Sequence, residues 1–223
     1  MIRVALAGGI GSGKSAATAY LRGRGYVVVD ADEVAREVVR PGRAAFEALV
    51  DAFGPGVLDP AGSIDRAFLA AVVFADPTAR RRVEAITHPR IAEAMAAALE
   101  EATGDVAFAA LPLYRAEHRA LLGLDEVWAL EVSPATALAR LCADRGMDPA
   151  DARARLAAQV TNEDRRRLAD RVIDNEGPLE DLRRALDDGF KDRRELLHDQ
   201  TLASLRATPA FAQLMADQRI PAR

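Results

Sequence analysis

The sequence predicts an α/β fold in which a five-stranded parallel sheet carries helices on both faces. Short apolar runs alternate with amphipathic segments, which is typical of strands joined by helical crossovers. The apolar runs occupy residues 2–7, 26–30, 105–112, 126–132 and 170–175. They are almost uninterrupted in hydrophobicity, as expected for strands that are buried on both faces of a sheet.

Helical periodicity and helix breakers account for most of the remaining chain. The predicted helices cover residues 14–24, 32–40, 43–53, 65–75, 78–102, 134–145, 149–168 and 178–198. Proline and glycine interrupt the pattern in RPGR (40–43) and GPGVLDPAGS (54–63), so we expect helices to end there.

One domain over residues 1–198 accommodates these elements. Residues 32–102 contain no strand candidate and are too long for one crossover, so we expect a helical insert after the second strand. A charged segment at about residues 140–169 is expected to form a lid. The core then consists of residues 1–31 and 103–198, and residues 199–223 are expected to form a C-terminal tail.

The composition favours a cytoplasmic protein that acts on small molecules. A formal net charge of −4 argues against a general nucleic-acid binder. No apolar stretch approaches the roughly 20 residues that cross a bilayer, and the chain begins without the features of a secretory signal. The single cysteine, Cys142, fits a reducing compartment. We therefore expect no membrane or nucleic-acid partner, and a monomer or weak homo-oligomer.

A glycine-rich segment, GGIGSGKS at residues 8–15, lies between the first predicted strand and the first predicted helix. It fits the pattern Gly-x-x-x-x-Gly-Lys-Ser, in which backbone N–H groups converge on phosphate oxygens because side chains are absent. The positive end of the following helix adds to this attraction. A helix cap needs one glycine, whereas this segment has four. The sequence therefore predicts a P-loop NTPase fold that binds a nucleoside triphosphate.

The residues of this loop have distinct expected roles. Lys14 is expected to reach the β- and γ-phosphates, and the Ser15 hydroxyl to bind Mg²⁺. A regulatory GTPase is disfavoured, because its Asn-Lys-x-Asp motif is absent: neither Lys14 nor Lys191 follows an asparagine. The predicted nucleotide site comprises Gly9, Ile10, Gly11, Ser12, Gly13, Lys14, Ser15 and Ala16.

Two carboxylates follow the second predicted strand, in VVVDADEVAREV (27–38). Asp30 ends the strand and Glu33 comes three residues later, at the spacing of a capping box, so Asp30 is predicted to cap the next helix. Asp32 is not needed for the cap, and ligands of open parallel sheets bind beyond the carboxyl ends of the strands. Asp32 could therefore accept a hydroxyl proton during phosphoryl transfer, or be a solvated acid of the first helical turn.

The expected lid and the strand after it are rich in arginine. Most of these side chains are expected to form a solvated helical surface, because acids are interspersed among them. A mobile arginine-bearing flap excludes water and neutralises charge in kinases, so one or two are expected to contact phosphates, although spacing does not say which. The arginines are Arg140, Arg145, Arg153, Arg155, Arg165, Arg166, Arg167 and Arg171.

Further motifs accompany the glycine loop in a characteristic order. They are DADEVAREVV, IDRAFLAAVVF, VEAITHPRI, RLAAQ and RRLADRVIDNEG. Their order and spacing across about residues 1–190 resemble the dephospho-CoA kinase family. The resemblance implies a P-loop kinase of the nucleoside-monophosphate-kinase type. It also implies ATP- and Mg²⁺-dependent phosphorylation of the ribose 3′-hydroxyl of dephospho-CoA, the last step of coenzyme A synthesis.

On the nucleotide side, the resemblance implies roles for individual residues. Asp32 matches the catalytic base of the family. Lys14 and Ser15 match the triphosphate and magnesium ligands. Arg140 matches a lid arginine that faces the phosphates, and Asn175 lies in the stretch that flanks the adenine.

On the acceptor side, the resemblance implies substrate contacts from His88, Arg66 and Leu113. From its own surroundings, His88 could instead be a structural histidine, because Pro89 is expected to hold its backbone extended. The segment PLYRAEH (112–118) departs from the family pattern at the end of a strand.

The predicted mechanism is in-line transfer of the γ-phosphoryl group of ATP. Asp32 would orient or deprotonate the acceptor hydroxyl, while Lys14, Mg²⁺ and Arg140 stabilise the charge on the transferring group. Two alternatives stay open: another small-molecule or nucleotide kinase of the same fold, and a regulator that binds ATP without transferring phosphate. A nucleic-acid kinase is disfavoured by the net charge and by the scarcity of aromatic side chains for base stacking.

Overall fold

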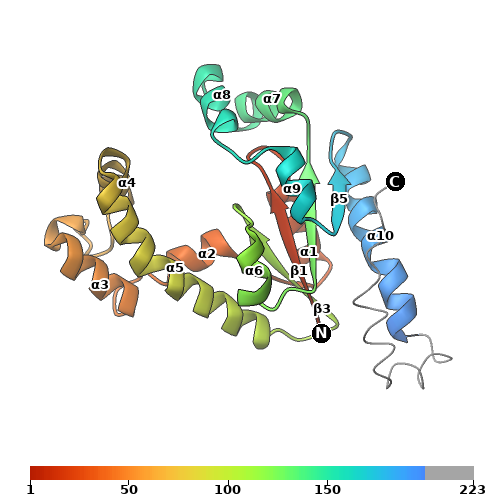
Figure 1. The fold of residues 1–223 in the computed structure, drawn as a ribbon, viewed down its shortest axis with the longest axis horizontal. Coiled ribbons are helices and arrows are strands. Elements are labelled where there is room, and N and C mark those ends of the chain that lie inside the picture. The colour runs from red at the N-terminus through yellow and green to blue at the C-terminus, as the bar shows by residue number, and fades with distance from the viewer. Residues whose placement is uncertain (199–223) are drawn as a thin grey trace.

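A five-stranded parallel sheet forms the centre of the computed structural model, which describes residues 1–198. The strands are β1 (Ile2–Gly8), β2 (Val27–Asp30), β3 (Val106–Leu111), β4 (Glu126–Glu131) and β5 (Arg171–Asp174). Their order is β2-β3-β1-β4-β5, and every neighbouring pair is parallel (Figure 1). The predicted sheet is confirmed, whereas the expected tail at 199–223 lies outside the described residues.

The sheet separates two hydrophobic cores, which explains why its inner strands β1, β3 and β4 are mostly apolar and buried, whereas the edge strand β5 buries Ile173 alone. Val4 and Leu6 of β1 face one core, which α1 (Lys14–Gly23) and α10 (Leu179–His198) cover. Ala5 and Ala7 face the other core, which α5 (Pro77–Glu100) covers. Successive residues of a strand point to opposite faces, so β1 is held from both sides. The loop after β1 therefore starts from a fixed position.

The other helices are α2 (Ala31–Glu37), α3 (Ala44–Phe53), α4 (Arg66–Ala75), α6 (Ala116–Leu121), α7 (Pro134–Arg145), α8 (Pro149–Ala157) and α9 (Asn162–Leu168). The prediction of one helix over 149–168 is wrong, because Thr161 caps α9 and accepts the Asp164 N–H through its hydroxyl at 3.1 Å. The short α6 is absent from the predicted elements, since six residues are too few for a periodic pattern. Within residues 1–198, no helix has both the length and the apolar character to cross a membrane.

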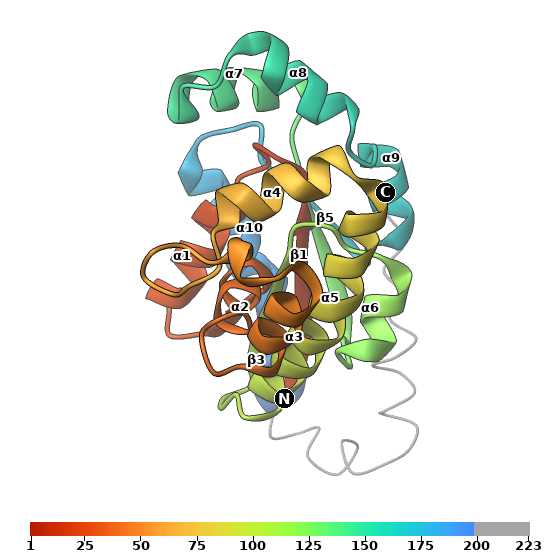
Figure 2. The same cartoon turned by 90° about the vertical axis from the view of Figure 1, so that its left-hand side faces the viewer.

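Between β2 and β3 the chain is mainly helical and builds a small core of its own. That core contains Phe46, Leu49, Val57 and Ile64. A short 3₁₀ turn (Pro55–Val57) and an isolated bridge between Leu58 and Ile64 connect α3 to α4. Figures 1 and 2 show α3 and α4 standing to one side of the sheet, while α7 and α8 lie beyond its carboxyl edge.

Helix α5 connects this small core to the sheet. Ile86 in its first half packs on the small core, and Leu99 in its second half is fully buried against the sheet. The helix continues through Pro89, so the expectation of an extended backbone at His88 is wrong. Proline inside a helix costs about 3 kcal/mol. The apolar area that α5 buries at both of its ends offsets this cost.

Helix α10 meets the sheet at Trp128, whose indole is buried on β4. A Cβ on Gly189 of α10 would lie 2.5 Å from Cη2 of this ring. In contrast, a Cβ on Gly23, the last residue of α1, would have no neighbour within 4 Å. Since both glycines are helical, substituting them separates the effect of packing from that of helix propensity.

Gly189→Ala is expected to lower the free energy of unfolding by about 1–3 kcal/mol, because the added methyl group overpacks a buried ring. Gly23→Ala is expected to raise it by up to about 1 kcal/mol, because alanine favours the helix and meets no neighbour. Urea unfolding of both variants and the parent measures these changes. A more stable Gly189→Ala variant would contradict the packing of α10 on Trp128.

Candidate active site

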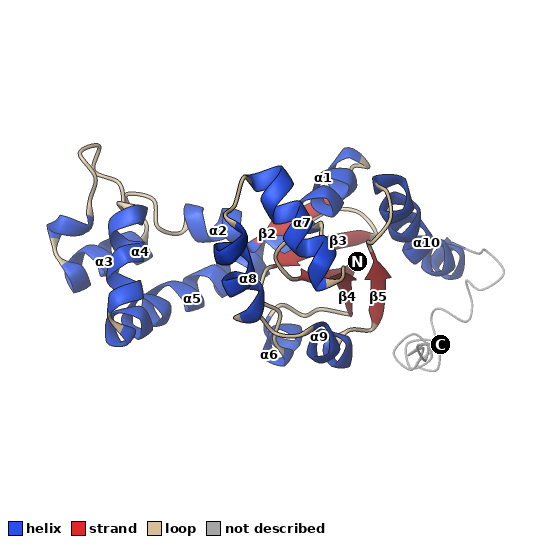
Figure 3. Ribbon diagram, turned by 90° about the horizontal axis from the view of Figure 1, so that it is seen from above, coloured by secondary structure: helices blue, strands red, loops and turns tan. Residues whose placement is uncertain are grey.

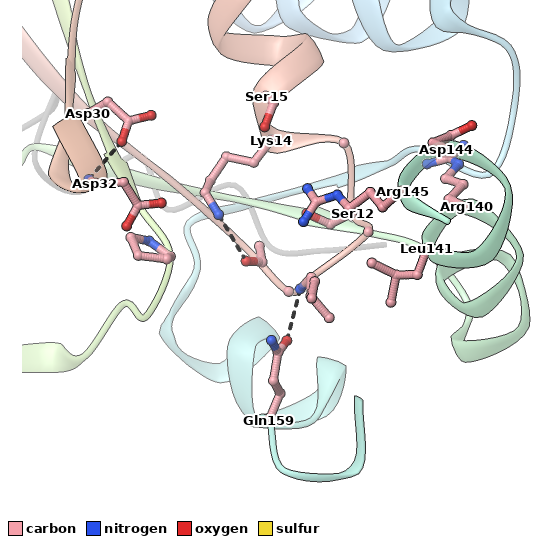
Figure 4. Close-up of a pocket in the computed structure, with 16 residues that line it drawn as sticks. Ser12, Lys14, Ser15, Asp30, Asp32, Arg140, Leu141, Asp144, Arg145 and Gln159 are labelled. Carbon is pink, nitrogen blue, oxygen red and sulfur yellow. Dashed lines mark hydrogen bonds between the residues drawn. The ribbon is translucent and has the colours of Figure 1, made fainter. Parts of the chain in front are cut away.

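Several segments meet at the carboxyl ends of the strands, where they line a pocket of about 320 Å³. This edge is where open parallel sheets bind ligands. The loop of residues 8–15 follows β1, and α7 and α8 lie over this edge when the molecule is viewed from above (Figure 3). The other lining residues are Asp30, Asp32, Pro112, Arg140, Leu141, Asp144, Arg145 and Gln159 (Figure 4).

The loop has a backbone that requires glycine at two positions. Gly11 and Gly13 have φ angles of 77° and 92°, in the left-handed region that side chains disfavour. A Cβ on Gly11 would also lie 3.0 Å from the carbonyl oxygen of Ala137, and one on Gly13 would overlap the side-chain amide of Asn175. Helix α1 begins at Lys14, so its unpaired N–H groups face the loop and favour an anion there.

Lys14 places a cation beside the loop. Its Nζ lies 3.5 Å from the carbonyl oxygen of Gly8, at the start of the loop. Burial lowers the pKa of Lys14, and the negative charges of Asp32 and Asp30 oppose this shift. A further anion beside the ammonium would also favour its charged form. The pocket therefore holds a desolvated cation that phosphate oxygens would stabilise.

Asp30 and Asp32 have different surroundings at the start of α2. Asp30 is the cap, as predicted, and its Oδ1 accepts the N–H of Asp32 at 2.8 Å. Glu33 does not complete the capping box and instead forms an ion pair with Arg22 at 2.6 Å. Among the residues that the structure describes, the Asp32 carboxylate has no hydrogen-bond or ion-pair partner, although it lines the pocket. It is therefore available to a ligand.

The segment predicted to be a lid contacts the site from two directions, as Figure 4 shows. Arg140 of α7 donates to the backbone oxygen of Asn175 at 2.7 Å, and Arg145 lies farther along the same helix. Gln159, between α8 and α9, accepts the N–H of Ile10 at 2.9 Å through its Oε1. The structure thus brings the predicted Arg140 into the pocket. Gln159 is outside the predicted site, because its contact is with a residue distant in the sequence.

Asn175 lies behind the loop, and it does not line the pocket. The residue is 5% exposed, and its Nδ2 donates to the carbonyl oxygen of Ser12 at 2.8 Å. Its backbone N–H donates to the carbonyl oxygen of Glu131 at 2.9 Å. Asn175 therefore ties the loop to the ends of β4 and β5, a contact that the sequence does not reveal.

Four further residues of the predicted site do not line this pocket. Ala16 packs against the core that α1 covers. Arg66 and His88 are exposed on α4 and α5, and Leu113 is 56% exposed beyond the end of β3. Leu113 directly follows the pocket residue Pro112. The assignment of Arg66, His88 and Leu113 to the acceptor side stays a prediction.

The pocket residues fit a magnesium ion that is shared with phosphates. The Ser15 hydroxyl and the carboxylates of Asp30 and Asp32 line the pocket, and Mg²⁺ prefers such oxygen ligands. The described part of the chain contains no group of three or more His, Cys, Asp or Glu residues that could hold a metal ion. Mg²⁺ commonly binds through one or two carboxylates together with substrate phosphates, so no such cage is required.

Asn175→Ala is expected to weaken ATP binding, because the loop loses an anchor and the Ser12 carbonyl loses its donor. An unsatisfied buried polar group costs about 1–3 kcal/mol, so the Kd is expected to rise about fivefold to a hundredfold. Titration with a fluorescent ATP analogue measures the Kd, and thermal unfolding checks that the variant is folded. An unchanged Kd in a folded variant would contradict the anchoring role.

Known proteins share both the sequence and the fold of this chain. The family model described as dephospho-CoA kinase matches residues 2–181. Dephospho-CoA kinases of Streptomyces avermitilis and Corynebacterium glutamicum are 45% and 42% identical to it, covering 86% and 82% of this chain and 94% and 95% of theirs. The crystal structure of TT1252 from Thermus thermophilus has a TM-score of 0.71 at 30% identity, covering 86% of this chain and 97% of that one. The chain belongs to the dephospho-CoA kinase family.

Proposed function

We propose that the protein transfers the γ-phosphoryl group of ATP to the ribose 3′-hydroxyl of dephospho-CoA. Membership of the family supplies the two substrates. One observation on this chain carries the chemistry: the Asp32 carboxylate, which has no partner among the described residues, and the partly buried Lys14 ammonium line the same pocket as the glycine loop. A base for the hydroxyl and a cation for the phosphates therefore belong to one site.

The residues of the site would divide the reaction as follows. The N–H groups of the loop and the start of α1 bind phosphate oxygens, and Lys14 contacts the β- and γ-phosphates. Asp32 orients the acceptor hydroxyl and accepts its proton as the new ester bond forms. Arg140 neutralises charge from the side of the lid, which also excludes water. Mg²⁺ bound at Ser15 would supply further neutralisation of the phosphate charge.

The acceptor is proposed to lie along the insert, residues 32–102. Asp32 lies at the start of this segment. With its hydroxyl beside Asp32, the rest of the acceptor would extend toward α4 and α5. His88 of α5 lies near a polar group of side chains, because its charge lowers the pKa of both Glu84 and His118. Arg115 acts on the same two residues, so the PLYRAEH segment belongs to this group. These surroundings support the assignment of His88 to acceptor binding, whereas Arg66 and Leu113 are proposed from the family resemblance alone.

The proposed enzyme is one domain over residues 1–198, with residues 32–102 as the acceptor-binding insert and about 140–169 as the lid. Its proposed partners are the two small-molecule substrates, with no nucleic acid or membrane. We propose a cytoplasmic location and a monomer or weak homo-oligomer. The net charge of −4 supports the assignment to small-molecule substrates.

The acceptor is tested by coupled release of ADP from ATP and Mg²⁺ in the presence of dephospho-CoA, adenosine or AMP. Turnover is expected with dephospho-CoA alone, since the family assignment specifies this acceptor. Turnover with adenosine or AMP would be consistent with the proposed ATP site but would show that dephospho-CoA is not the specific acceptor. Binding of ATP without turnover on any acceptor would favour a regulator that transfers nothing.

Asp32→Asn is expected to lower kcat by about 10²- to 10⁴-fold, because the amide cannot accept the hydroxyl proton. The KM for ATP is expected to change little, since the loop and Lys14 remain. Glu33→Gln is the matched control, because Glu33 is adjacent in sequence but pairs with Arg22, and its kcat should stay near the parent value. A near-normal kcat for Asp32→Asn would refute the assignment of the base.

A further inference from the structure

Three consecutive arginines on α9 differ in their partners. Arg166 Nε contacts Glu131 Oε2 at 2.7 Å. Arg167 pairs with Glu163 at 2.6 Å and with Asp164 at 3.0 Å. Among the described residues, Arg165 has no carboxylate at ion-pair distance. Arg165 therefore differs from Arg166 and Arg167, which each contact a carboxylate.

Arg165 packs against the phosphate loop. A Cβ on Gly9 would lie 2.7 Å from Nη2 of Arg165, so the guanidinium approaches the loop backbone as closely as a glycine permits. Gly9 directly follows Gly8, whose carbonyl oxygen lies near Nζ of Lys14. Arg165 does not itself line the pocket; it reaches the pocket through Gly9 and Gln159, which do. Because such a lysine is the ligand of the β- and γ-phosphates, this side of the loop is the one that a γ-phosphate would approach.

Two neutral amides hold the guanidinium in this place. Nη1 donates to Oδ1 of Asn162 at 2.6 Å, and Nη2 donates to Oε1 of Gln159 at 3.4 Å. Asn162 in turn donates to the carbonyl oxygen of Val132 at 2.9 Å, just beyond β4. The same Gln159 oxygen accepts the N–H of Ile10. The side chain is therefore oriented by neutral groups, and no carboxylate of the described residues contacts it.

The electrostatic surroundings of Arg165 are also those of an anion site. Burial lowers the pKa of Arg165, and Glu131 opposes the shift from a distance. The positive charge of Arg165 also contributes to lowering the pKa of Lys14. Two half-desolvated cations near one loop are unfavourable together unless an anion is placed between them.

We propose that Arg165 is a catalytic residue of the lid that binds the γ-phosphate of ATP, and that Gln159 is the positioning residue that presents it. This inference rests on the proposed phosphoryl transfer. In that step the bond between the γ-phosphorus and the β–γ bridging oxygen breaks, and a bond to the acceptor oxygen forms. The hydroxyl proton passes to Asp32 and ADP leaves. Arg165 donates to the γ-phosphate oxygens while the charge is redistributed.

The test compares the affinities of the protein for ATP and ADP, because only ATP carries the γ-phosphate. Arg165→Ala is expected to weaken ATP binding about tenfold or more and to leave ADP binding unchanged, since a charge-assisted hydrogen bond to γ-phosphate is lost. Arg165→Lys should recover part of the difference because it keeps the charge. Arg167→Ala is the control, expected to leave both affinities unchanged. An unaltered ratio of ATP to ADP affinity in Arg165→Ala would overturn the assignment.

Gln159→Glu tests the positioning role separately. The carboxylate keeps an acceptor for the Ile10 N–H but supplies the counter-charge that Arg165 lacks. The ratio of ATP to ADP affinity is therefore expected to fall as in Arg165→Ala, while thermal stability is kept. An unchanged ratio would show that Gln159 does not present Arg165 to the nucleotide.

These binding measurements are independent of the acceptor. If the parent protein binds ATP but does not phosphorylate dephospho-CoA, the proposed function fails, and the affinity ratio still decides the role of Arg165. If it phosphorylates dephospho-CoA and the ratio is unaltered in Arg165→Ala, only the role of Arg165 fails.

Discussion

The close approach of other segments to the bare backbone of the phosphate loop is the constraint on which the site depends. The side chain of Arg165 packs at Gly9, the backbone of Ala137 at Gly11 and the side chain of Asn175 at Gly13. A methyl group at any of these glycines would meet one of these neighbours. The glycines therefore let α7, α9 and the residue after β5 approach the loop, and they also leave its N–H groups accessible to an anion.

Two hydrogen bonds attach this loop to different parts of the molecule. Asn175 holds the Ser12 carbonyl from the sheet, and Gln159 holds the Ile10 N–H from the lid. Asn175 is buried and its own N–H is bonded to Glu131 at the end of β4, so the first attachment is held by the sheet. The second comes from Gln159, which lies between the short helices α8 and α9. The same loop is thus held both from the sheet and from the segment between α8 and α9.

The sequence predicted the features that depend on residues close together in the chain. The inner strands were identified because burial on both faces makes them apolar, and the loop because its pattern is contiguous. Asn175 and Gln159 lie 163 and 149 residues from their loop partners, so no local spacing contains these contacts. The preference of Pro89 for ending a helix was overridden by the two cores that α5 joins. Likewise, only the fold distinguishes Arg165 from its neighbours.

The continuity of α5 has a mechanical consequence. One half of the helix is embedded in the small core between β2 and β3, and the other half in the core against the sheet. Pro89 stands between these halves and cannot donate to the carbonyl oxygen four residues earlier, which leaves the rod most compliant at that point. A rotation of the small core relative to the sheet must either bend α5 at Pro89 or disrupt the packing of one of the two cores. Bending of α5 is therefore expected to be concentrated at Pro89.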